Sequence, residues 1–307
     1  GFYTSNVTVT WAVTDGEYAI SNRTGCDAVT ISQDTMGQTL TCNATSEGGT
    51  STRSVTIKRD ATAPEASAAA TSMPNANGWY GSNVTVKFSG TDATSGVSSC
   101  SGNVTVAAEG SDQSSATGIC TDKAGNVSAP VKASGIKIDK TAPTVTGVRS
   151  PAANAAGWNN KTITVSFSAT DGTSGTDAAS CGASVTLSND GFGQSATGYC
   201  EDRAGNKGSA TVSGINIDTL APHATATPSP APNVNGWNNI NVTVSFSGTD
   251  SMSGSGLASC ATAVLIAAEG TGVVSAGTCS DLAGNTSNAA TASINLDKTS
   301  PSVTITT

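Results

Sequence analysis

Apolar and polar residues alternate strictly over short stretches of this chain. In the segment ITVSFSAT at 163–170, the apolar residues Ile163, Val165 and Phe167 are separated by threonine or serine. Successive side chains of a β-strand point to opposite faces, so this alternation produces one apolar face and one polar face. The β-branched residues of the segment also favour an extended backbone. We predict a β-strand over about 161–170 with one side buried and the other in solvent.

The same alternation occurs in three other places, which predicts a repeated strand. The equivalent apolar positions are Val7, Val9 and Trp11, then Val84, Val86 and Phe88, and finally Val242, Val244 and Phe246. Turn-forming clusters such as DATSG, SNDG and DRAGN separate the strand-like segments, and no stretch has helical periodicity of useful length. About seven short strands in each repeat are typical of an immunoglobulin-like β-sandwich. We therefore predict an all-β chain of tandem immunoglobulin-like modules.

Three sequence marks recur in one register along the chain. The first is GWYGSNVTVKFSGTD at Gly78, GWNNKTITVSFSATD at Gly157 and GWNNINVTVSFSGTD at Gly236, starting 79 residues apart, with GFYTSNVTVTWAVTD opening the chain. The second is the turn TDKAGN, EDRAGN or SDLAGN, and the third is IKRDATAP, IKIDKTAP, INIDTLAP or INLDKTSP. A fixed period of this length indicates an array of repeated domains. The expected boundaries are a partial module at 1–61, modules at 62–140, 141–219 and 220–298, and a short segment at 299–307.

The module at 141–219 illustrates the expected order of strands. We predict a first strand after Pro143, a strand at about 161–170, and a strand that starts near Cys181. A turn at 189–191 follows, then a strand that ends near Cys200, and a last strand at about 208–218.

Composition narrows the range of partners. Charged residues make up 12% of the 307 residues, aromatic residues make up 4%, and the net charge is −8. So few large apolar side chains suit several small cores better than one large core. Nucleic-acid binding requires clustered Lys and Arg, and docking on anionic lipid also requires positive charge, so neither partner is expected. The longest apolar run, Ala263–Ala268, is too short to span a bilayer, so we expect no membrane insertion within this chain.

The eight cysteines follow the repeat, with two in each copy. The expected disulfides are Cys26–Cys42, Cys100–Cys120, Cys181–Cys200 and Cys260–Cys279. An even count that keeps the period of the repeat implies one disulfide in each module. Zinc binding and free buried thiols are the alternatives, but the chain has no CxxC pair and its only histidine is His223. Persistent disulfides place the protein outside the reducing cytosol, in an extracellular location.

Residues that would form a catalytic centre are missing from the sequence. One histidine cannot serve four repeated units, and no Ser–His–Asp set, HExxH, P-loop or GxGxxG motif is present. We expect that the protein is not an enzyme and requires no cofactor. Trp79, Trp158 and Trp237 are able to stack on sugars. The alternative is that they cover the open end of a small core, because each copy keeps an aromatic residue at this position.

The three marks resemble the bacterial immunoglobulin-like repeats of very large surface and secreted proteins. The resemblance is carried by GWxNxxVTVSFSxTD, the xDxAGN turn and IxIDKTAP, which together cover nearly the whole chain. It implies a stalk, adhesin or filament role. The first copy departs from the pattern, because the residues 43–47 (NATSE) replace the xDxAGN turn, and a ligand role of that turn is in doubt there.

Nine aspartates are candidate ligands for a divalent cation, calcium above all, at the module junctions. They come from the linkers, from the end of the alternating strand and from the AGN turn: Asp60, Asp92 and Asp122; Asp139, Asp171 and Asp202; Asp218, Asp250 and Asp281. In an immunoglobulin-like sandwich these positions share one pole, so three carboxylates and nearby turn carbonyls supply the hard oxygen ligands that calcium takes. The alternative is that each aspartate caps its own turn through hydrogen bonds to the backbone, without metal.

We therefore expect a non-enzymatic structural or adhesive extracellular repeat protein, a stalk or spacer of a surface adhesin. The alternatives are a subunit of a self-assembling filament with head-to-tail contacts and a carbohydrate-binding accessory region of a secreted enzyme. The expected partners are neighbouring modules or copies of the chain, together with surface glycans or proteins. The segment PSVTITT at 301–307 has the pattern of a first strand. It is either part of a longer array or a strand donated to the open edge of another copy.

Overall fold

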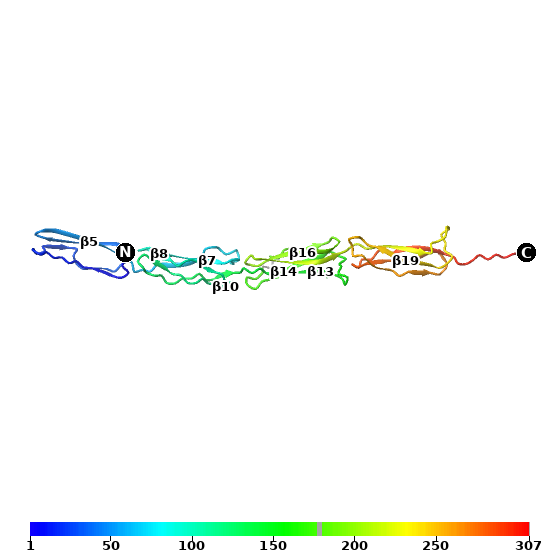
Figure 1. Cartoon of the computed structure of the whole chain (residues 1–307), viewed down its shortest axis with the longest axis horizontal. Coiled ribbons are helices and arrows are strands. Elements are labelled where there is room, and N and C mark those ends of the chain that lie inside the picture. Colours follow the sequence, from blue (N-terminus) through cyan, green and yellow to red (C-terminus); the bar gives the residue numbers. More distant parts are fainter. Residues whose placement is uncertain (177–179, 307) are drawn as a thin grey trace. The chain divides into compact units, whose positions relative to one another are not determined.

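The computed structural model describes residues 1–176 and 180–306, and its regular secondary structure consists of β-strands (Figure 1). The described residues form no helix, so none of them supplies a helix that could cross a membrane. The chain divides into two compact units. The first contains Gly1–Thr141, Gly172–Gly175 and Asp202–Asn206, and the second contains Ala142–Asp171, Thr176–Glu201 and Lys207–Thr307. Thr307, the last residue of the predicted segment 299–307, lies outside the described residues.

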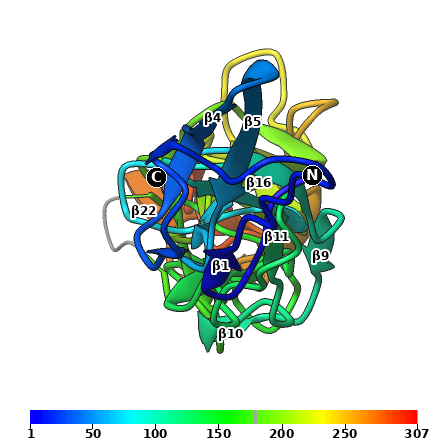
Figure 2. The same ribbon diagram turned by 90° about the vertical axis from the view of Figure 1, so that its left-hand side faces the viewer.

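The first module contains two small sheets. Its strands are β1 (Val7–Val9), β2 (Asn22–Thr24), β3 (Val29–Ile31), β4 (Thr35–Ser46) and β5 (Gly49–Arg59). One sheet joins β1 to β3, and the other has the order β2-β4-β5. The long hairpin of β4 and β5 is seen in Figure 2, where the two strands lie side by side.

The second module has the fuller set of strands. They are β6 (Glu65–Ala70), β7 (Val84–Thr91), β8 (Val97–Cys100), β9 (Val104–Val106), β10 (Gly110–Gln113), β11 (Cys120–Asp122) and β12 (Ile136–Ile138). One sheet has the order β6-β7-β9, and the facing layer contains the pairs β8-β11 and β10-β12. Each described strand pairing of the molecule joins strands of the same predicted module.

The third and fourth modules repeat this plan. The third contains β13 (Thr144–Ser150), β14 (Ile163–Thr170), β15 (Val185–Leu187), β16 (Gly191–Glu201) and β17 (Lys207–Ile217), in the sheets β13-β14-β15 and β16-β17. The fourth contains β18 (His223–Ser229), β19 (Val242–Thr249), β20 (Leu257–Cys260), β21 (Val264–Ile266), β22 (Gly270–Gly277), β23 (Cys279–Asp281) and β24 (Ala290–Leu296). Its sheets are β18-β19-β21, β20-β23 and β22-β24. These all-β modules are immunoglobulin-like.

The alternating pattern predicts the buried face correctly. Val84 and Val86 of β7, like Val242 and Val244 of β19, have no exposed surface, and threonine or lysine residues between them reach solvent. Burying one such side chain contributes about 1.5–3 kcal/mol relative to leaving it in water. Each of the second, third and fourth modules has its own small core built around these residues.

Two details of the predicted strand map are wrong. The strand next to the first cysteine was expected to start there, but β8 ends at Cys100 and β20 ends at Cys260, and no described strand begins at Cys181. In the second and fourth modules the partner strand begins at the second cysteine, so the two cysteines form the last aligned pair of the ladder, as in Cys100↔Cys120. In the third module β16 ends next to Cys200, as predicted. In the first module the alternation continues to Trp11, yet β1 ends at Val9.

The cysteines form four disulfides, each inside one predicted module. The pairs are Cys26–Cys42, Cys100–Cys120, Cys181–Cys200 and Cys260–Cys279. Two of them, Cys100–Cys120 and Cys260–Cys279, link β8 to β11 and β20 to β23. A bridge that closes a loop of this size stabilises a domain by about 3 kcal/mol in the chain-entropy model. That contribution is substantial for modules with such small cores.

Candidate metal site at the module junctions

Each linker aspartate is held by two modules at once. The N–H of Asp60 donates to the carbonyl of Tyr3 in the first module, at 2.8 Å. Its carboxylate Oδ2 accepts the N–H of Ser95 in the second module, at 3.0 Å, and its carbonyl accepts Nδ2 of Asn126, also at 3.0 Å. The Asp60 side chain has no exposed surface. A single residue therefore joins the last strand of one module to two loops of the next.

The same three contacts recur at the other linkers. Asp218 donates its N–H to the carbonyl of Asn159, at 2.9 Å, and accepts Ser255 N–H at 2.7 Å and Asn285 Nδ2 at 2.8 Å. Asp139 accepts Ser174 N–H and Asn206 Nδ2, both at 3.0 Å. The repetition shows that the contacts belong to the repeated sequence and not to one module.

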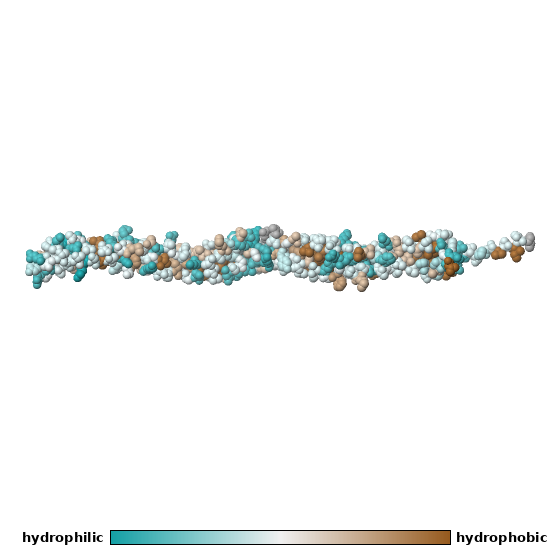
Figure 3. Space-filling view, turned by 90° about the horizontal axis from the view of Figure 1, so that it is seen from above, coloured by the Kyte–Doolittle hydropathy of each residue, from teal (hydrophilic) through white to brown (hydrophobic). Residues whose placement is uncertain are grey.

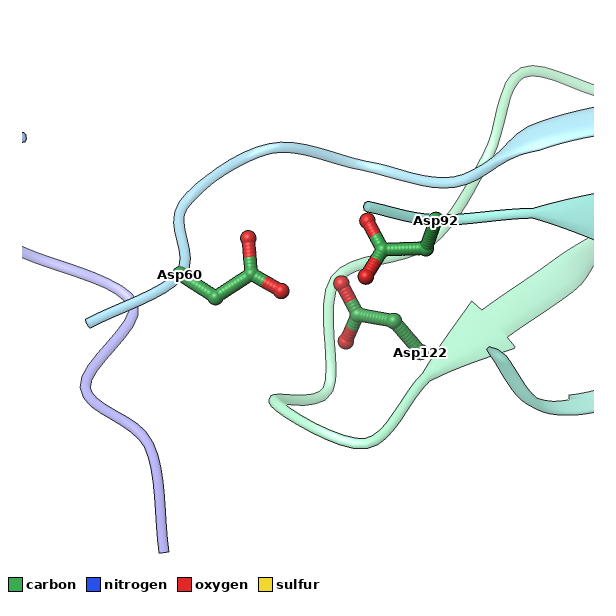
Figure 4. Close-up of side chains that lie close together, drawn as sticks. All are labelled: Asp60, Asp92 and Asp122. Carbon is green, nitrogen blue, oxygen red and sulfur yellow. The ribbon is translucent and has the colours of Figure 1, made fainter. Parts of the chain in front are cut away.

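Three carboxylates converge at these junctions, as Figure 4 shows for Asp60, Asp92 and Asp122. Asp92 follows β7 and Asp122 ends β11, and one oxygen from each of the three lies within 4.8 Å of the others. Asp218, Asp250 and Asp281 meet the same criterion. Of the third predicted set, Asp139 and Asp202 belong to the first compact unit and Asp171 belongs to the second.

Backbone amides of the loops cap some of these carboxylate oxygens. Oδ1 of Asp92 accepts the N–H of Thr94 at 3.3 Å and of Gly96 at 2.7 Å. Oδ1 of Asp122 accepts the N–H of Gly125 at 2.6 Å and of Asn126 at 2.8 Å. The turn-capping hydrogen bonds of the alternative interpretation are thus present. A carboxylate has two oxygens with about four acceptor sites, so capping at Oδ1 still leaves acceptor capacity for a cation.

The pKa of Asp122 lies below its ordinary value. Burial raises this pKa, but the hydrogen bonds from Asn126, Gly125 and Ala124 together outweigh burial and lower it. Asp122 therefore carries a negative charge at neutral pH inside the cluster. Like charges so close together repel one another unless a cation or hydrogen-bond donors offset them.

The fourth module offers further oxygens. Five positions separate Asp250 from Ser255, where three separate Asp92 from Ser95. In this longer loop, Oδ1 of Asp250 and Oγ of Ser251 are buried and have no hydrogen-bond partner among the described residues. Gly254 lies against this group of oxygens, because a Cβ atom at this position would lie 2.5 Å from Ser251 Oγ, 2.9 Å from Asp250 Oδ2 and 3.0 Å from Asp218 Oδ2. The loop therefore presents unpaired oxygen ligands next to two carboxylates.

The spacing of these oxygens is compatible with calcium. Calcium takes oxygen ligands at about 2.3–2.6 Å, so two ligands on opposite sides of the ion are about 5 Å apart. Carboxylate oxygens within 4.8 Å of one another can share one ion at that distance. The first module is different, because Asp15, the equivalent of Asp92, accepts the N–H of Glu17 and of Tyr18, and Ala44 stands where Asp122 would be.

A second acidic contact at each linker was not predicted. In every module a carboxylate that stands three residues after a short strand (β3, β9, β15 or β21) accepts hydrogen bonds from the residues after the linker aspartate. These carboxylates are Asp34, which binds Ala61 and Thr62; Glu109, which binds Lys140 and Thr141; Asp190, which binds Thr219; and Glu269, which binds Lys298 and Thr299. The residue type and its distance from the linker vary, but each carboxylate keeps its place three residues after the short strand, and this local signal could have identified it. Only the strand pairing brings the two segments together.

An asparagine in the loop after the first strand also bridges modules. Oδ1 of Asn154 caps the N–H groups of Ala156 and Trp158, both at 3.0 Å, and Nδ2 donates to the carbonyl of Leu282 at 2.9 Å. Asn75 does the same toward the carbonyl of Arg203, at 2.8 Å. Because Oδ1 caps the N–H of Trp158, as Asn75 caps that of Trp79, the loop fixes the start of each tryptophan segment. Trp79 is buried, which favours a structural role for this residue, whereas Trp158 and Trp237 are only partly buried.

No protein-family model and no curated protein matches this chain. Similar solved structures include one from work on the host cell surface retention of a 1.5-MDa bacterial ice-binding adhesin. Its sequence identity to this chain is 16%, the match covers 85% of this chain and 92% of that chain, and the TM-score is 0.35. A second is a tetra-tandem repeat in the extending region of a large adhesion protein, at 14% identity over 97% of both chains, with a TM-score of 0.32. A third contains the eight N-terminal Ig domains of Down Syndrome Cell Adhesion Molecule, at 11% identity over 96% of this chain and 45% of that chain, with a TM-score of 0.31. These neighbours are bacterial adhesin repeats and tandem immunoglobulin domains, and the likeness at this level carries no information on function.

Proposed function

We propose that this chain is a non-enzymatic structural segment of an extracellular protein, a stalk or spacer of a surface adhesin, whose successive modules are coupled by calcium. The observation that carries the proposal is the shared linker aspartate. Asp60 and Asp218 are fully buried, each tied through its backbone to the preceding module and through its side chain to the following one. A linker of this kind restricts bending between the two modules that it joins, which suits a spacer.

The four disulfides support an extracellular location. Each of them closes a loop inside one module, and such bonds persist in oxidising compartments. A repeated module with its own bridge withstands conditions outside the cell without a large core. A spacer needs this kind of local stability, because each module contacts only its neighbours.

The calcium part of the proposal rests on the carboxylate geometry. Two sets of three aspartates bring oxygens within 4.8 Å of one another. In the second set, Asp250 Oδ1 and Ser251 Oγ are buried and find no hydrogen-bond partner in the part of the chain that the structure describes, which is costly unless a cation or water completes them. An ion bound there would attach the linker aspartate to both loops of the next module, and so would strengthen the coupling that the hydrogen bonds provide.

Differential scanning calorimetry with and without calcium tests this proposal. We expect the melting temperature to fall in a chelator and to recover on adding calcium, because a ligand at about 100 times its Kd stabilises the folded state by about 2.7 kcal/mol. Asp250→Asn and Gly254→Ala should each abolish the calcium response of the fourth module. Asp297→Asn, at the exposed equivalent of the linker aspartates, is the matched control and should keep the full response.

Small-angle scattering supplies the second readout. With calcium, the maximum dimension of the chain should be larger than in the chelator, and the range of chain dimensions in solution should be narrower. Both effects are expected because coupled modules bend less. If melting and scattering are both unchanged by calcium, the carboxylates act only as turn caps. The spacer role would then depend on the hydrogen-bonded linkers alone.

A further inference from the structure

A pocket of about 210 Å³ lies in the third module, beside the tryptophan segment. It is lined by residues 151–154 of the loop after β13 and by residues 158–161, together with Ala283 from the AGN turn of the fourth module. All of these residues belong to the second compact unit. Drug-sized ligands occupy pockets of about 300–1,000 Å³, so this smaller pocket suits a ligand with a single ring.

The pocket carries polar groups that no described residue engages. Asn159 is 5% exposed, and its Nδ2 donates to the carbonyl of Ala152 at 2.9 Å. Its Oδ1 is buried and has no hydrogen-bond partner among the described residues. Asn160 and Lys161 are exposed, and within the described part of the chain neither side chain forms a hydrogen bond or an ion pair. A buried acceptor without a donor is costly, so a hydroxyl group that enters the pocket gains free energy by reaching Oδ1 of Asn159.

Trp158 supplies the aromatic surface of the pocket. This residue is only partly buried, whereas Trp79, at the same place in the second module, is buried. The N–H of Trp158 is held by Oδ1 of Asn154 at 3.0 Å, and Nδ2 of Asn154 donates to the carbonyl of Leu282 at 2.9 Å. The loop that positions the tryptophan is therefore fixed before a ligand binds, which lowers the entropic cost of binding.

A sugar ring matches an aromatic residue that stands beside amide groups. The C–H groups on one face of a pyranose pack against an aromatic ring, and its hydroxyl groups donate and accept hydrogen bonds. Oδ1 of Asn159 offers an acceptor, the amide of Asn160 offers a donor and an acceptor, and Lys161 offers donors with a positive charge. On the face seen in Figure 3, apolar colour occurs in small separate patches among hydrophilic and intermediate colours. Such a surface suits a polar ligand better than a large apolar partner.

The full set of polar groups occurs in the third module alone among the modules that carry the tryptophan. In the second module the residues equivalent to 159–161 are Tyr80, Gly81 and Ser82. The fourth module keeps the two amides as Asn238 and Asn239, but Ile240 replaces the lysine. A residue needed to build the repeat would recur in each of these modules, so a set confined to one module indicates a role in binding.

We propose that this pocket binds one pyranose ring of a glycan, stacked on Trp158 and hydrogen-bonded by Asn159 and Asn160. Lys161 makes a ring that carries a carboxylate, a uronic acid, the preferred ligand, because hydrogen bonds between an ammonium group and a carboxylate are charge-assisted. The third module then adds glycan binding to an otherwise structural array. This binding does not depend on the calcium sites, since none of the three residues that contact the ring belongs to a set of three aspartates.

Ligand-observed saturation-transfer NMR on residues 1–307 tests the proposal, with methyl glucuronide and methyl glucoside as probes. We expect saturable binding of methyl glucuronide, with the protons of one ring face receiving the most saturation. Trp158→Ala should abolish the signal. Asn160→Gly, which copies the second module, should weaken binding of both sugars about two- to tenfold, the contribution of a hydrogen bond.

The lysine is tested by a second pair of variants. Lys161→Ile, which copies the fourth module, should weaken methyl glucuronide about two- to fivefold and leave methyl glucoside unchanged, because an exposed ion pair contributes a factor of that size. Lys87→Ser removes an exposed lysine from β7 and is the matched control, with no expected change for either sugar. The proposal is overturned if methyl glucuronide gives no saturation transfer, or if Trp158→Ala and Asn160→Gly bind it as the parent chain does. Equal effects of Lys161→Ile and Lys87→Ser would overturn the preference for a uronic acid.

Discussion

The main-chain N–H of Ser255 donates a 2.7 Å hydrogen bond to Oδ2 of Asp218, a fully buried side chain that belongs to the preceding linker. The equivalent residue after the fourth module, Asp297, keeps its backbone hydrogen bond to Asn238 but its side chain is exposed. The difference is the presence or absence of a following module against the linker. Burial of a linker aspartate is therefore a property of the junction, not of the module that carries it.

Replacing Asp218 with asparagine should destabilise the junction even without calcium. Asp218 accepts the N–H groups of Leu220 and Ser255 through its two oxygens, and an asparagine has only one oxygen to offer. A buried donor without an acceptor costs about 1–3 kcal/mol. Urea denaturation in a chelator should show a loss of this size for Asp218→Asn. Asp297→Asn should change the unfolding free energy by less than about 0.5 kcal/mol, and equal losses in the two variants would contradict the junction role.

Asn154 permits a cleaner measurement of one bond between modules. Asn154→Asp keeps the oxygen that caps Ala156 and Trp158 but removes the Nδ2 donor to Leu282. Asn233 caps Asn235 and Trp237 in the same way, and no described residue accepts a bond from its Nδ2. We expect Asn154→Asp to cost about 1 kcal/mol more than Asn233→Asp, measured by thermal unfolding. Similar losses would mean that the bond to Leu282 contributes nothing.

The disulfides should act module by module. Changing both Cys181 and Cys200 to serine opens a loop of sequence separation 19 and should cost about 3 kcal/mol in the third module. Native-state hydrogen exchange resolved by peptide should show faster exchange over β13–β17 and little change over β6–β12. Peptide mapping without reduction serves as the control on pairing, and a bridge between different modules would contradict the predicted pattern.

Acid should weaken the first junction through Asp34. The side chain of Thr62 and the main chain of Ala61 donate to this carboxylate and lower its pKa from 3.8; burial opposes them, and Arg59 lowers it further. Because the folded-state pKa is lower than the unfolded one, the stabilisation is complete above pH 3.8 and is lost as the pH falls toward the folded-state pKa. Urea midpoints measured from about pH 7 to about pH 2 should fall more steeply for the parent chain than for Asp34→Asn. Parallel curves for the two chains would rule out this contribution.

Much of the fold follows from the sequence because its information is local. The two-residue alternation of Ile163, Val165 and Phe167 determines which face of β14 is buried, and Pro143 precedes the strand that begins at Thr144. The alternation says nothing about partners, however. It continues to Trp11 in the first module, but the strand ends at Val9 because strand length depends on a neighbour to pair with.

In the candidate site, too, the sequence predicts some features and leaves others undetermined. The period of the repeat was enough to place Asp60, Asp92 and Asp122 at one pole, because all three belong to marks that keep one register. The sequence could not predict the acidic contacts of Asp34 and Glu109 with the linkers, since a position three residues after a short strand does not reveal which distant segment packs against it. Nor could it show that loop amides cap one oxygen of Asp92 and of Asp122, because such bonds depend on the path of each turn.

The sequence by itself therefore determined the module, its repeat, the buried face of each main strand and the set of aspartates at the pole. Those features depend on residue type and spacing, which a linear pattern records. Tertiary structure alone decided which aspartates are buried and which oxygens remain without a donor among the described residues. Those features depend on what packs against a residue from a distant part of the chain, as Asp218 is buried by the module that follows it and Asp297 is exposed without one.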